Sequence, residues 1–219
     1  MKPIAFFDVD KTLLNGYSGF YATITLVQRR LVRPHHVLAA LFYRIIAPLY
    51  HGDVRRMYEM ILYDLVDHPL TEVMSIGKEC FEKNIRPKIF QDGIKLVEDH
   101  KRMGHQVVLL SSGPSMVIDH VADFLQVDQS YSNGPVVRDG RLQKELREPL
   151  CYQEGKLITA QQVAKNAGVD LTTCYYYADS IDDLSLLLRV GHPRPVNPDR
   201  ELRDLAQQNG WEIRYFKKI

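Results

Sequence analysis

The sequence predicts an α/β fold of three layers, with helices on both faces of a mainly parallel sheet. Two observations predict it. Short apolar segments at residues 4–7, 107–110 and 174–178 alternate with segments of helical periodicity, as in right-handed strand–helix–strand units. Each apolar segment is followed directly by polar residues, as at the ligand-binding edge of a parallel sheet.

The N-terminal part combines one strand with a helical insertion. Residues 4–7 are all apolar, which is typical of a strand buried on both faces. Helical spacing over residues 20–31, 37–50, 54–65 and 70–84 predicts an all-helical insertion of about four helices, with no convincing strand. We therefore expect a core of residues 1–14 and 89–219 and a helical domain of residues 15–88.

The C-terminal part returns to alternating elements. A helix over residues 93–103 ends at Gly104, and the strand at 107–110 leads into a helix at 116–125. Residues 131–142 predict a hairpin around Asp139-Gly140. The remaining expected elements are helices at 157–167, 184–189 and 201–209, and strands at 174–178, 195–196 and, at the sheet edge, 211–216.

Composition limits the possible partners and compartments. Among 219 residues, 28 Lys and Arg balance 27 Asp and Glu, so no nucleic-acid partner is expected. Three cysteines without a Cys-x-x-Cys pair argue against disulfides or thiolate zinc. Without a signal-peptide pattern at the N-terminus, the cytoplasm is the expected location. Residues 37–50 are the most apolar stretch, but Arg44 and Pro48 interrupt it, so a membrane partner is not expected.

Two carboxylates follow the first strand with one residue between them. Asp8 and Asp10 can both face the crevice at the strand's carboxyl end. Carboxylates held this close repel each other, and a hard cation such as Mg²⁺ relieves the repulsion. Thr12 adds a hydroxyl to this cluster. Taken alone, the pattern is more simply explained as a turn or a helix N-cap.

Matching polar groups follow the other strands. Ser111 and Ser112 stand at the end of the second strand, where a helix begins, and Asp179 and Asp183 follow the third. Lys156 lies at a predicted helix N-terminus, where its positive charge opposes the helix dipole and calls for a partner. Each residue alone could be a cap or a surface residue, but together they suit the handling of a phosphoryl group with a divalent cation.

The chemistry assigns a role to each group. With Mg²⁺ offsetting charge repulsion, Asp8 can attack phosphorus and form an aspartyl-phosphate. Asp10 can protonate the leaving oxygen and later deprotonate water. The serine hydroxyls and helix N–H groups can hold phosphoryl oxygens, and Lys156 can neutralise charge. Asp179 can complete the metal shell.

The ordered motifs resemble those of the haloacid dehalogenase (HAD) superfamily, subfamily IB, which includes phosphoserine phosphatase-like enzymes. The resemblance implies a Rossmann-like core with a helical C1 cap inserted after the first motif. It rests on the segments Asp8-Val9-Asp10-Lys11-Thr12, Leu110-Ser111, Lys156 and Ala178-Asp179-Ser180-Ile181-Asp182-Asp183, and on the later runs Gly191-His192-Pro193, Val196-Asn197-Pro198 and Gly210-Trp211.

The resemblance implies a role for each matching residue. Asp8 matches the nucleophile and a metal ligand, and Asp10 matches the acid/base, which also lends the metal a backbone carbonyl. Ser111 matches the phosphate-binding serine, and Lys156 matches the lysine of the third motif. Asp179 matches a metal ligand, and Asp183, in preference to the adjacent Asp182, matches the second acid of the same motif. Ser112 adjoins the substrate, and Thr12 adjoins the nucleophile.

The implied function is Mg²⁺-dependent hydrolysis of a small phosphate monoester. Phosphoserine itself is less favoured, because Tyr17 stands where phosphoserine phosphatases carry a glutamate. A lipid head-group phosphatase of the phosphatidylglycerophosphate type is a subordinate alternative, since the apolar helix at 37–50 is more simply explained as burying its face inside the cap.

A receiver-like phospho-acceptor module and a non-catalytic binding protein could also carry part of this pattern. The acid two residues after Asp8 argues against a receiver, and the intact set of acids and lysine argues against a non-catalytic protein. Candidate substrate contacts in the helical domain are Tyr17, Tyr21, Arg30 and Arg44.

Overall fold

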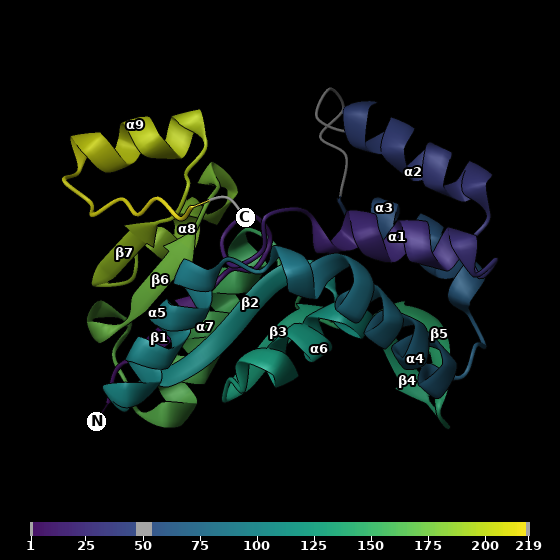
Figure 1. The fold of residues 1–219 in the computed structure, drawn as a ribbon, viewed down its shortest axis with the longest axis horizontal. Coiled ribbons are helices and arrows are strands. Elements are labelled where there is room, and N and C mark those ends of the chain that lie inside the picture. Colours follow the sequence, from purple (N-terminus) through teal and green to yellow (C-terminus); the bar gives the residue numbers. More distant parts are fainter. Residues whose placement is uncertain (1, 47–53, 218–219) are drawn as a thin grey trace.

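A five-stranded parallel sheet forms the centre of the molecule (Figure 1). The computed structural model describes residues 2–46 and 54–217 of the chain. The strands are β1 (Ile4–Phe7), β2 (Gln106–Pro114), β3 (Gln129–Asn133), β6 (Tyr175–Ala178) and β7 (His192–Pro195), in the order β3-β2-β1-β6-β7. All four pairings are parallel, which confirms the predicted α/β fold.

The apolar residues of the central strands alternate between two cores. Phe7 and Leu109 pack on one face of the sheet, and Phe6 and Leu110 pack on the other. The first face is covered by α5 (Gln91–Arg102) and α6 (Ser115–Leu125), and the second by α7 (Glu154–Ala167), α8 (Leu184–Leu187) and α9 (Arg200–Gln208). The sheet is therefore buried on both sides, which explains why its central strands read as continuous apolar runs.

The chain places its strand-order switch between β1 and β6. From β1 it runs to β2 and β3 on one side, and later to β6 and β7 on the other. The Asp8 N–H donates to the Tyr177 carbonyl at 2.9 Å, so β1 and β6 stay paired up to their carboxyl ends. Parallel sheets bind ligands outside the carboxyl ends at such a switch point.

Residues 15–88, here called the helical insert, leave the sheet edge after β1. They form α1 (Ser18–Gln28), α2 (Pro34–Ile46), α3 (Val54–Leu62) and α4 (Leu70–Cys80), with a 3₁₀ turn at Tyr63–Leu65, a π turn at Phe81–Ile85 and a 3₁₀ turn at Arg86–Lys88. Figure 1 shows α1 and α2 to one side of the sheet and its covering helices. The end of the predicted helix at 37–50 lies outside the described residues.

The predicted hairpin forms, but as a separate two-stranded sheet. Strands β4 (Pro135–Arg138) and β5 (Arg141–Leu146) pair antiparallel around Asp139 and Gly140, both at positive φ. The hairpin joins the helical insert, because the Leu70 N–H donates to the Gly140 carbonyl and the Leu142 N–H to the His68 carbonyl. The hairpin therefore connects the insert to the second half of the chain.

Three sequence expectations about elements differ from the structure. The expected strand at 211–216 is absent, and an isolated bridge between Val196 and Arg214 is all that forms there. The strand at 195–196 is the end of β7, which begins at His192. Helix α2 is buried only in part over its described side chains, because Ala40 is buried and Val37 packs against the core while Leu38, Leu41 and Phe42 are all more than half exposed.

Candidate active site

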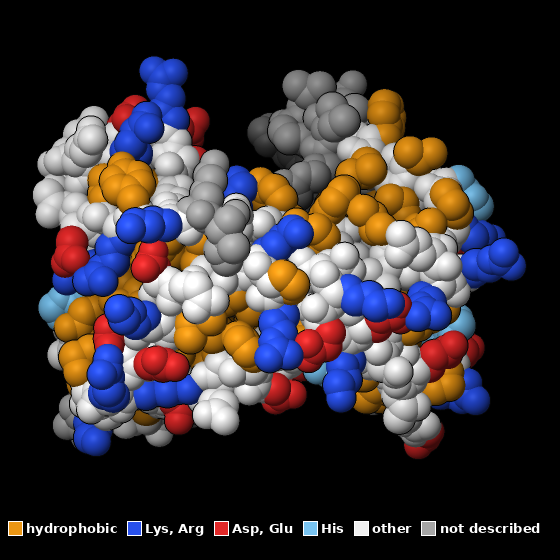
Figure 2. All heavy atoms as spheres, viewed as in Figure 1, with side chains coloured by type: hydrophobic (Ala, Val, Ile, Leu, Met, Phe, Trp, Pro, Cys, Tyr) orange, Lys and Arg blue, Asp and Glu red, His pale blue; other side chains and the backbone are white. Residues whose placement is uncertain are grey.

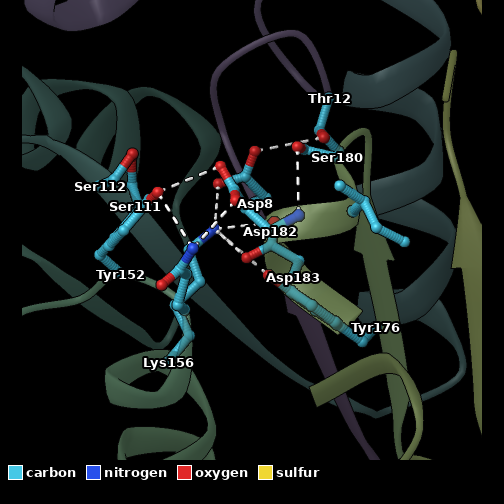
Figure 3. A network of polar contacts seen from close by, with 12 residues as sticks. Asp8, Thr12, Ser111, Ser112, Tyr152, Lys156, Tyr176, Ser180, Asp182 and Asp183 are labelled. Atoms are coloured by element: carbon cyan, nitrogen blue, oxygen red, sulfur yellow. Dashed lines mark hydrogen bonds and ion pairs between the residues drawn. The ribbon is translucent and has the colours of Figure 1, made fainter. Parts of the chain in front are cut away.

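A buried ammonium–carboxylate cluster lies at the carboxyl edge of β1 and β6 (Figure 3). Lys156 Nζ lies 2.7 Å from Asp8 Oδ1 and 2.8 Å from Asp183 Oδ1. It also donates to the Tyr176 hydroxyl at 3.3 Å. Asp8, Lys156 and Asp183 are each at most 4% exposed, so the two ion pairs are shielded from water.

Each member of the cluster is held by the element that carries it. Asp8 follows the central strand β1, and Asp183 closes a short 3₁₀ turn after β6. Lys156 is in the first turn of α7, whose start packs closely on the preceding loop, since a Cβ at Gly155 would lie 1.8 Å from the Leu150 carbonyl oxygen. Glycine at position 155 thus allows α7 to bring Lys156 to the sheet edge.

The neighbouring Asp182 points elsewhere. Its carboxylate is exposed and accepts hydrogen bonds from the Tyr152 hydroxyl at 3.2 Å and from Gln153 Nε2 at 3.0 Å. Asp183 is therefore the acid of this pair that faces Lys156.

Asp10 and Thr12 occupy the loop that leaves β1. The Thr12 hydroxyl lies 3.3 Å from the second oxygen of the Asp8 carboxylate. Asp10 accepts a hydrogen bond from the Ser18 N–H at 2.8 Å, which ties the loop to the first residue of α1. The side chain of Asp10 is thus directed to the helical insert, in contrast to that of Asp8.

Ser111 and Ser112 lie near the end of β2 and differ in role. The Ser111 hydroxyl is fully buried and accepts the Gly113 N–H at 3.0 Å, a contact compatible with donation of its hydrogen to a ligand. The Ser112 carbonyl accepts the Tyr58 hydroxyl at 2.5 Å and Asn133 Nδ2 at 3.2 Å. Ser112 therefore joins the β2 loop to the helical insert.

Asp179 follows β6 and is 6% exposed. Its nearest cation is Lys11, whose ammonium lies 3.8 Å away and also 4.8 Å from the centroid of the Tyr17 ring. Burial raises the pKa of Asp179 to about 8, and the Asp8 carboxylate adds to the shift. This is a carboxylate that needs a further cation to remain ionised at neutral pH.

The pKa values of the other carboxylates are also raised, and burial is again the main cause. Burial raises the pKa of Asp183 to about 6 and also raises the pKa of Asp8 and Asp10, although Lys156 opposes the shift in each case. Burial opposes the charged form of Lys156, but Asp183 and Asp8 outweigh it and hold the pKa of Lys156 well above its usual value.

The donor set fits a divalent, oxygen-seeking cation. Four carboxylates, of Asp8, Asp10, Asp179 and Asp183, are set against the two ammonium groups of Lys11 and Lys156. In the described part of the chain, no three His, Cys, Asp or Glu side chains could hold an ion by themselves. An ion here would need backbone carbonyls and water in addition to carboxylates, which is how Mg²⁺ is usually bound.

Of the four residues of the helical insert that were expected to contact the substrate, the three with described side chains do not lie together. Tyr17 is half exposed beside Lys11, and the Tyr21 ring packs over Gly16 and against Lys88. Arg30 lies beyond the C-terminal end of α1, a helix of 11 residues that is about 16 Å long and begins at Ser18. The Arg44 side chain lies outside the described residues.

Sequence reasoning missed three residues of this region. Tyr176 is an aromatic residue in a predicted strand and is expected to be a core residue; nothing in the sequence marks its hydroxyl as a partner of Lys156. Tyr58 lies in a predicted helix, and nothing marks its hydroxyl as a donor to the Ser112 carbonyl. Ser18 is fully buried, its hydroxyl lacks a hydrogen-bond partner among the described residues, and it would lie 2.1 Å from a Cβ at Gly113. Its position at a helix start, after Gly16, was the one signal that could have marked it.

The fold and the cluster together define a class of protein, a parallel α/β protein with acids and a lysine at its topological switch point. A model of the haloacid dehalogenase-like hydrolase family matches residues 5–188. The chain belongs to this family, and the expectation of a phosphatase-type enzyme of the family is confirmed.

Three curated relatives align along nearly the whole chain. A probable phosphatase of Mycobacterium tuberculosis is 30% identical over 99% of this chain and 76% of its own length. Phosphoserine phosphatase SerB1 of the same species is 29% identical, over 97% of this chain and 70% of its own length. A histidinol-phosphatase of Neisseria meningitidis is 28% identical, over 99% of this chain and 100% of its own length.

A solved structure confirms the architecture. A protein of unknown function from Bordetella pertussis superposes with a TM-score of 0.84 at 25% identity, over 98% of both chains. The likeness therefore extends over the sheet, its covering helices and the helical insert.

Proposed function

We propose that this protein is a Mg²⁺-dependent phosphatase that hydrolyses a small phosphate monoester through an aspartyl-phosphate on Asp8. The proposal rests chiefly on the Lys156 ammonium, which lies within 3 Å of both Asp8 and Asp183 in a buried cluster. A buried lysine next to the attacking carboxylate offsets the charge of an incoming phosphate dianion.

The chain's own residues then have separate tasks. Asp8 attacks phosphorus, and Thr12 and Lys156 hold its two oxygens in place. The buried Ser111 hydroxyl, near the end of β2, donates to a phosphoryl oxygen. Asp10, whose pKa burial raises, protonates the leaving oxygen and takes a proton from water in the second half-reaction.

The metal shell in this proposal consists of Asp8, Asp179 and the backbone carbonyl of Asp10. When bound there, Mg²⁺ supplies positive charge that lowers the repulsion between the substrate and Asp8. Asp183 orients Lys156, because the two groups form the second of the buried ion pairs. In the same proposal the helical insert, residues 15–88, is the cap that closes over the site and excludes water.

The substrate is expected to be a small phosphate monoester, in line with the relatives that act on phosphoserine and histidinol phosphate by name. Tyr17 and Lys11 border the site with an aromatic ring and an ammonium group, and neither supplies a carboxylate for a substrate amine. This favours a substrate other than phosphoserine. We place the reaction in the cytoplasm, in line with three cysteines that form no disulfide. We expect no nucleic-acid partner, because the chain as a whole carries a formal charge of +1.

The experiment is turnover of an aryl phosphate in the presence of Mg²⁺. Wild-type protein should turn over many times, and a chelator should abolish the activity. Asp8→Asn should remove activity without loss of the fold, while Asp182→Asn, a matched change in an exposed acid, should retain it. Near-wild-type activity of Asp8→Asn would refute the assigned nucleophile.

Turnover also separates an enzyme from a receiver-like module. A receiver would accept a phosphoryl group from acetyl phosphate and hold it for minutes, whereas the proposed enzyme releases phosphate repeatedly. A panel of amino-alcohol, sugar, nucleotide and lipid head-group phosphates then identifies the substrate class. The highest kcat/KM on a lipid head-group phosphate would favour a lipid phosphatase over an enzyme for small monoesters.

A further inference from the structure

We infer that the exposed apolar side chains of the helical insert dock on the surface of an anionic lipid bilayer. Both α1 and α2 expose large apolar side chains at helical spacing. Phe20 and Ile24 on α1 are 59% and 39% exposed; Leu38, Leu41 and Phe42 on α2 are 65%, 52% and 63% exposed. We call these five residues the apolar face. Figure 2 shows hydrophobic side chains gathered over this part of the molecule.

The exposed apolar side chains of α2 recur at helical spacing and are not scattered singly. Single exposed leucines are common, but side chains recurring at i, i+3 and i+4 along a helix form a continuous stripe. On α2 this stripe is Leu38, Leu41 and Phe42, while Ala40 on the same helix is buried in the protein. A helix that exposes such a stripe can lie in the plane of the membrane interface, with the stripe at the boundary of head groups and acyl chains.

The charge around the apolar face selects the partner. Residues 15–52, which contain all of α1 and α2, include no acidic residue and four arginines. The whole insert, residues 15–88, carries a formal charge of +3, although the complete chain carries +1. Arg29 and Arg33 pair with Glu79 and Asp64, whereas Arg30 is exposed in the turn between α1 and α2. Cationic groups beside an apolar face attract anionic lipid head groups.

The same charges disfavour a second copy of this chain as the occupant. Two copies apposed through this face would each bring an insert of formal charge +3, and their mutual repulsion opposes the contact. A spanning segment is not what the face indicates either, since no helix within residues 2–46 and 54–217 is long and apolar enough to cross a membrane. The geometry points to peripheral docking with the helices in the plane of the interface.

The test is flotation of the full chain with vesicles of phosphatidylglycerol and phosphatidylcholine, and with vesicles of phosphatidylcholine alone. The wild type should bind the mixed vesicles more tightly, and added salt should weaken the binding because it screens the arginines. Leu41→Ser together with Phe42→Ser should lower the affinity roughly tenfold or more, since each loses an apolar side chain from the interface. Arg30→Asn should lower it on the anionic vesicles alone; asparagine suits the positive φ of 61° at that position.

The matched control replaces Leu188 and Tyr215 by serine, since their exposure is similar to that of Leu41 and Phe42 but they lie outside the insert. This control should bind as the wild type does. Absence of binding to mixed vesicles, or equal losses in the Leu41/Phe42 variant and the control, would overturn the inference. So would a dimer in sedimentation that the Leu41/Phe42 variant dissociates. Hydrolysis of a soluble aryl phosphate should be the same in this variant and the wild type, so failure of docking is distinguishable from failure of the proposed function.

Discussion

Removal of the buried ammonium by Lys156→Met should destabilise the fold and eliminate activity. In the wild type, Lys156 pairs with Asp8 at 2.7 Å and with Asp183 at 2.8 Å, and all three groups are nearly inaccessible to water. Methionine fills a similar volume but leaves two carboxylates buried without their cation. Breaking a buried pair in this way costs about 3–5 kcal/mol of unfolding free energy.

The effect should depend on pH in a defined direction. The pKa of Asp183 is already about 6 with Lys156 present, and that of Asp8 is also raised, both mainly through burial. Without the ammonium both pKa values rise further. A carboxyl whose folded pKa exceeds its unfolded value binds more protons in the folded state, so stability falls as pH rises toward the folded pKa. Lys156→Met should therefore be least stable at alkaline pH and regain stability as pH falls toward 5.

Urea unfolding in the presence of a chelator measures this effect without interference from bound cations. The control is Lys165→Met, because Lys165 lies on the same helix α7 but is exposed. The control should change the unfolding free energy by no more than about 0.5 kcal/mol. A Lys156→Met protein within about 1 kcal/mol of the wild type at pH 8, with no gain toward pH 5, would refute the reasoning about the buried pairs.

Three further predictions follow from single contacts. Asp10→Asn should slow turnover of an aryl phosphate by about 10²–10⁴-fold, because it removes a positioned proton donor; an unchanged rate would exclude Asp10 as the acid. Gly155→Ala should lower the unfolding free energy by about 1–3 kcal/mol and reduce activity, because the alanine Cβ would lie 1.8 Å from the Leu150 carbonyl oxygen. Thermal unfolding measures the loss of stability, and a variant as stable as the wild type would contradict the prediction. Burial lowers the pKa of His100 from 6.5 to about 4. The unfolding free energy should therefore fall by about 1–2 kcal/mol as pH falls from 6.5 toward 4, after allowance for solvent screening. In urea unfolding, His100→Phe should weaken this pH dependence of the unfolding free energy, and an unaltered dependence would contradict the assignment.

Much of the fold could be predicted because its central strands are buried on both faces. Residues 4–7, 107–110 and 174–178 are almost purely apolar, and a run of this kind has few alternatives once helices flank it. The edge strand β3 was not separated from the hairpin that follows, because Gln-Ser-Tyr-Ser-Asn carries no apolar alternation. The strand predicted at 211–216 was wrong for the opposite reason. Its alternating side chains suit a strand, but the chain leaves the sheet and forms one bridge at Arg214.

The candidate site divides in the same way. Asp8, Asp10, Asp179 and Asp183 could be anticipated, because acids directly after predicted parallel strands must meet at one edge. The hydroxyls of Tyr176 and Tyr58 could not, since their use depends on which backbone or ammonium group lies opposite in the folded chain. For α2, periodicity indicated which residues share a face, but exposure of that face depends on the neighbouring helices.

The helical insert contacts both loops that would handle the phosphoryl group. The Ser18 N–H holds the Asp10 carboxylate at 2.8 Å, and the Tyr58 hydroxyl holds the Ser112 carbonyl at 2.5 Å. These two contacts come from α1 and α3, so a movement of the insert would alter the proposed acid and the phosphate-binding loop together. Because α1 also carries part of the apolar face, docking of that face on a bilayer would act on the same helix that positions Asp10. Contact of the insert with a bilayer would thereby be coupled to the position of the Asp10 carboxylate, the proposed proton donor.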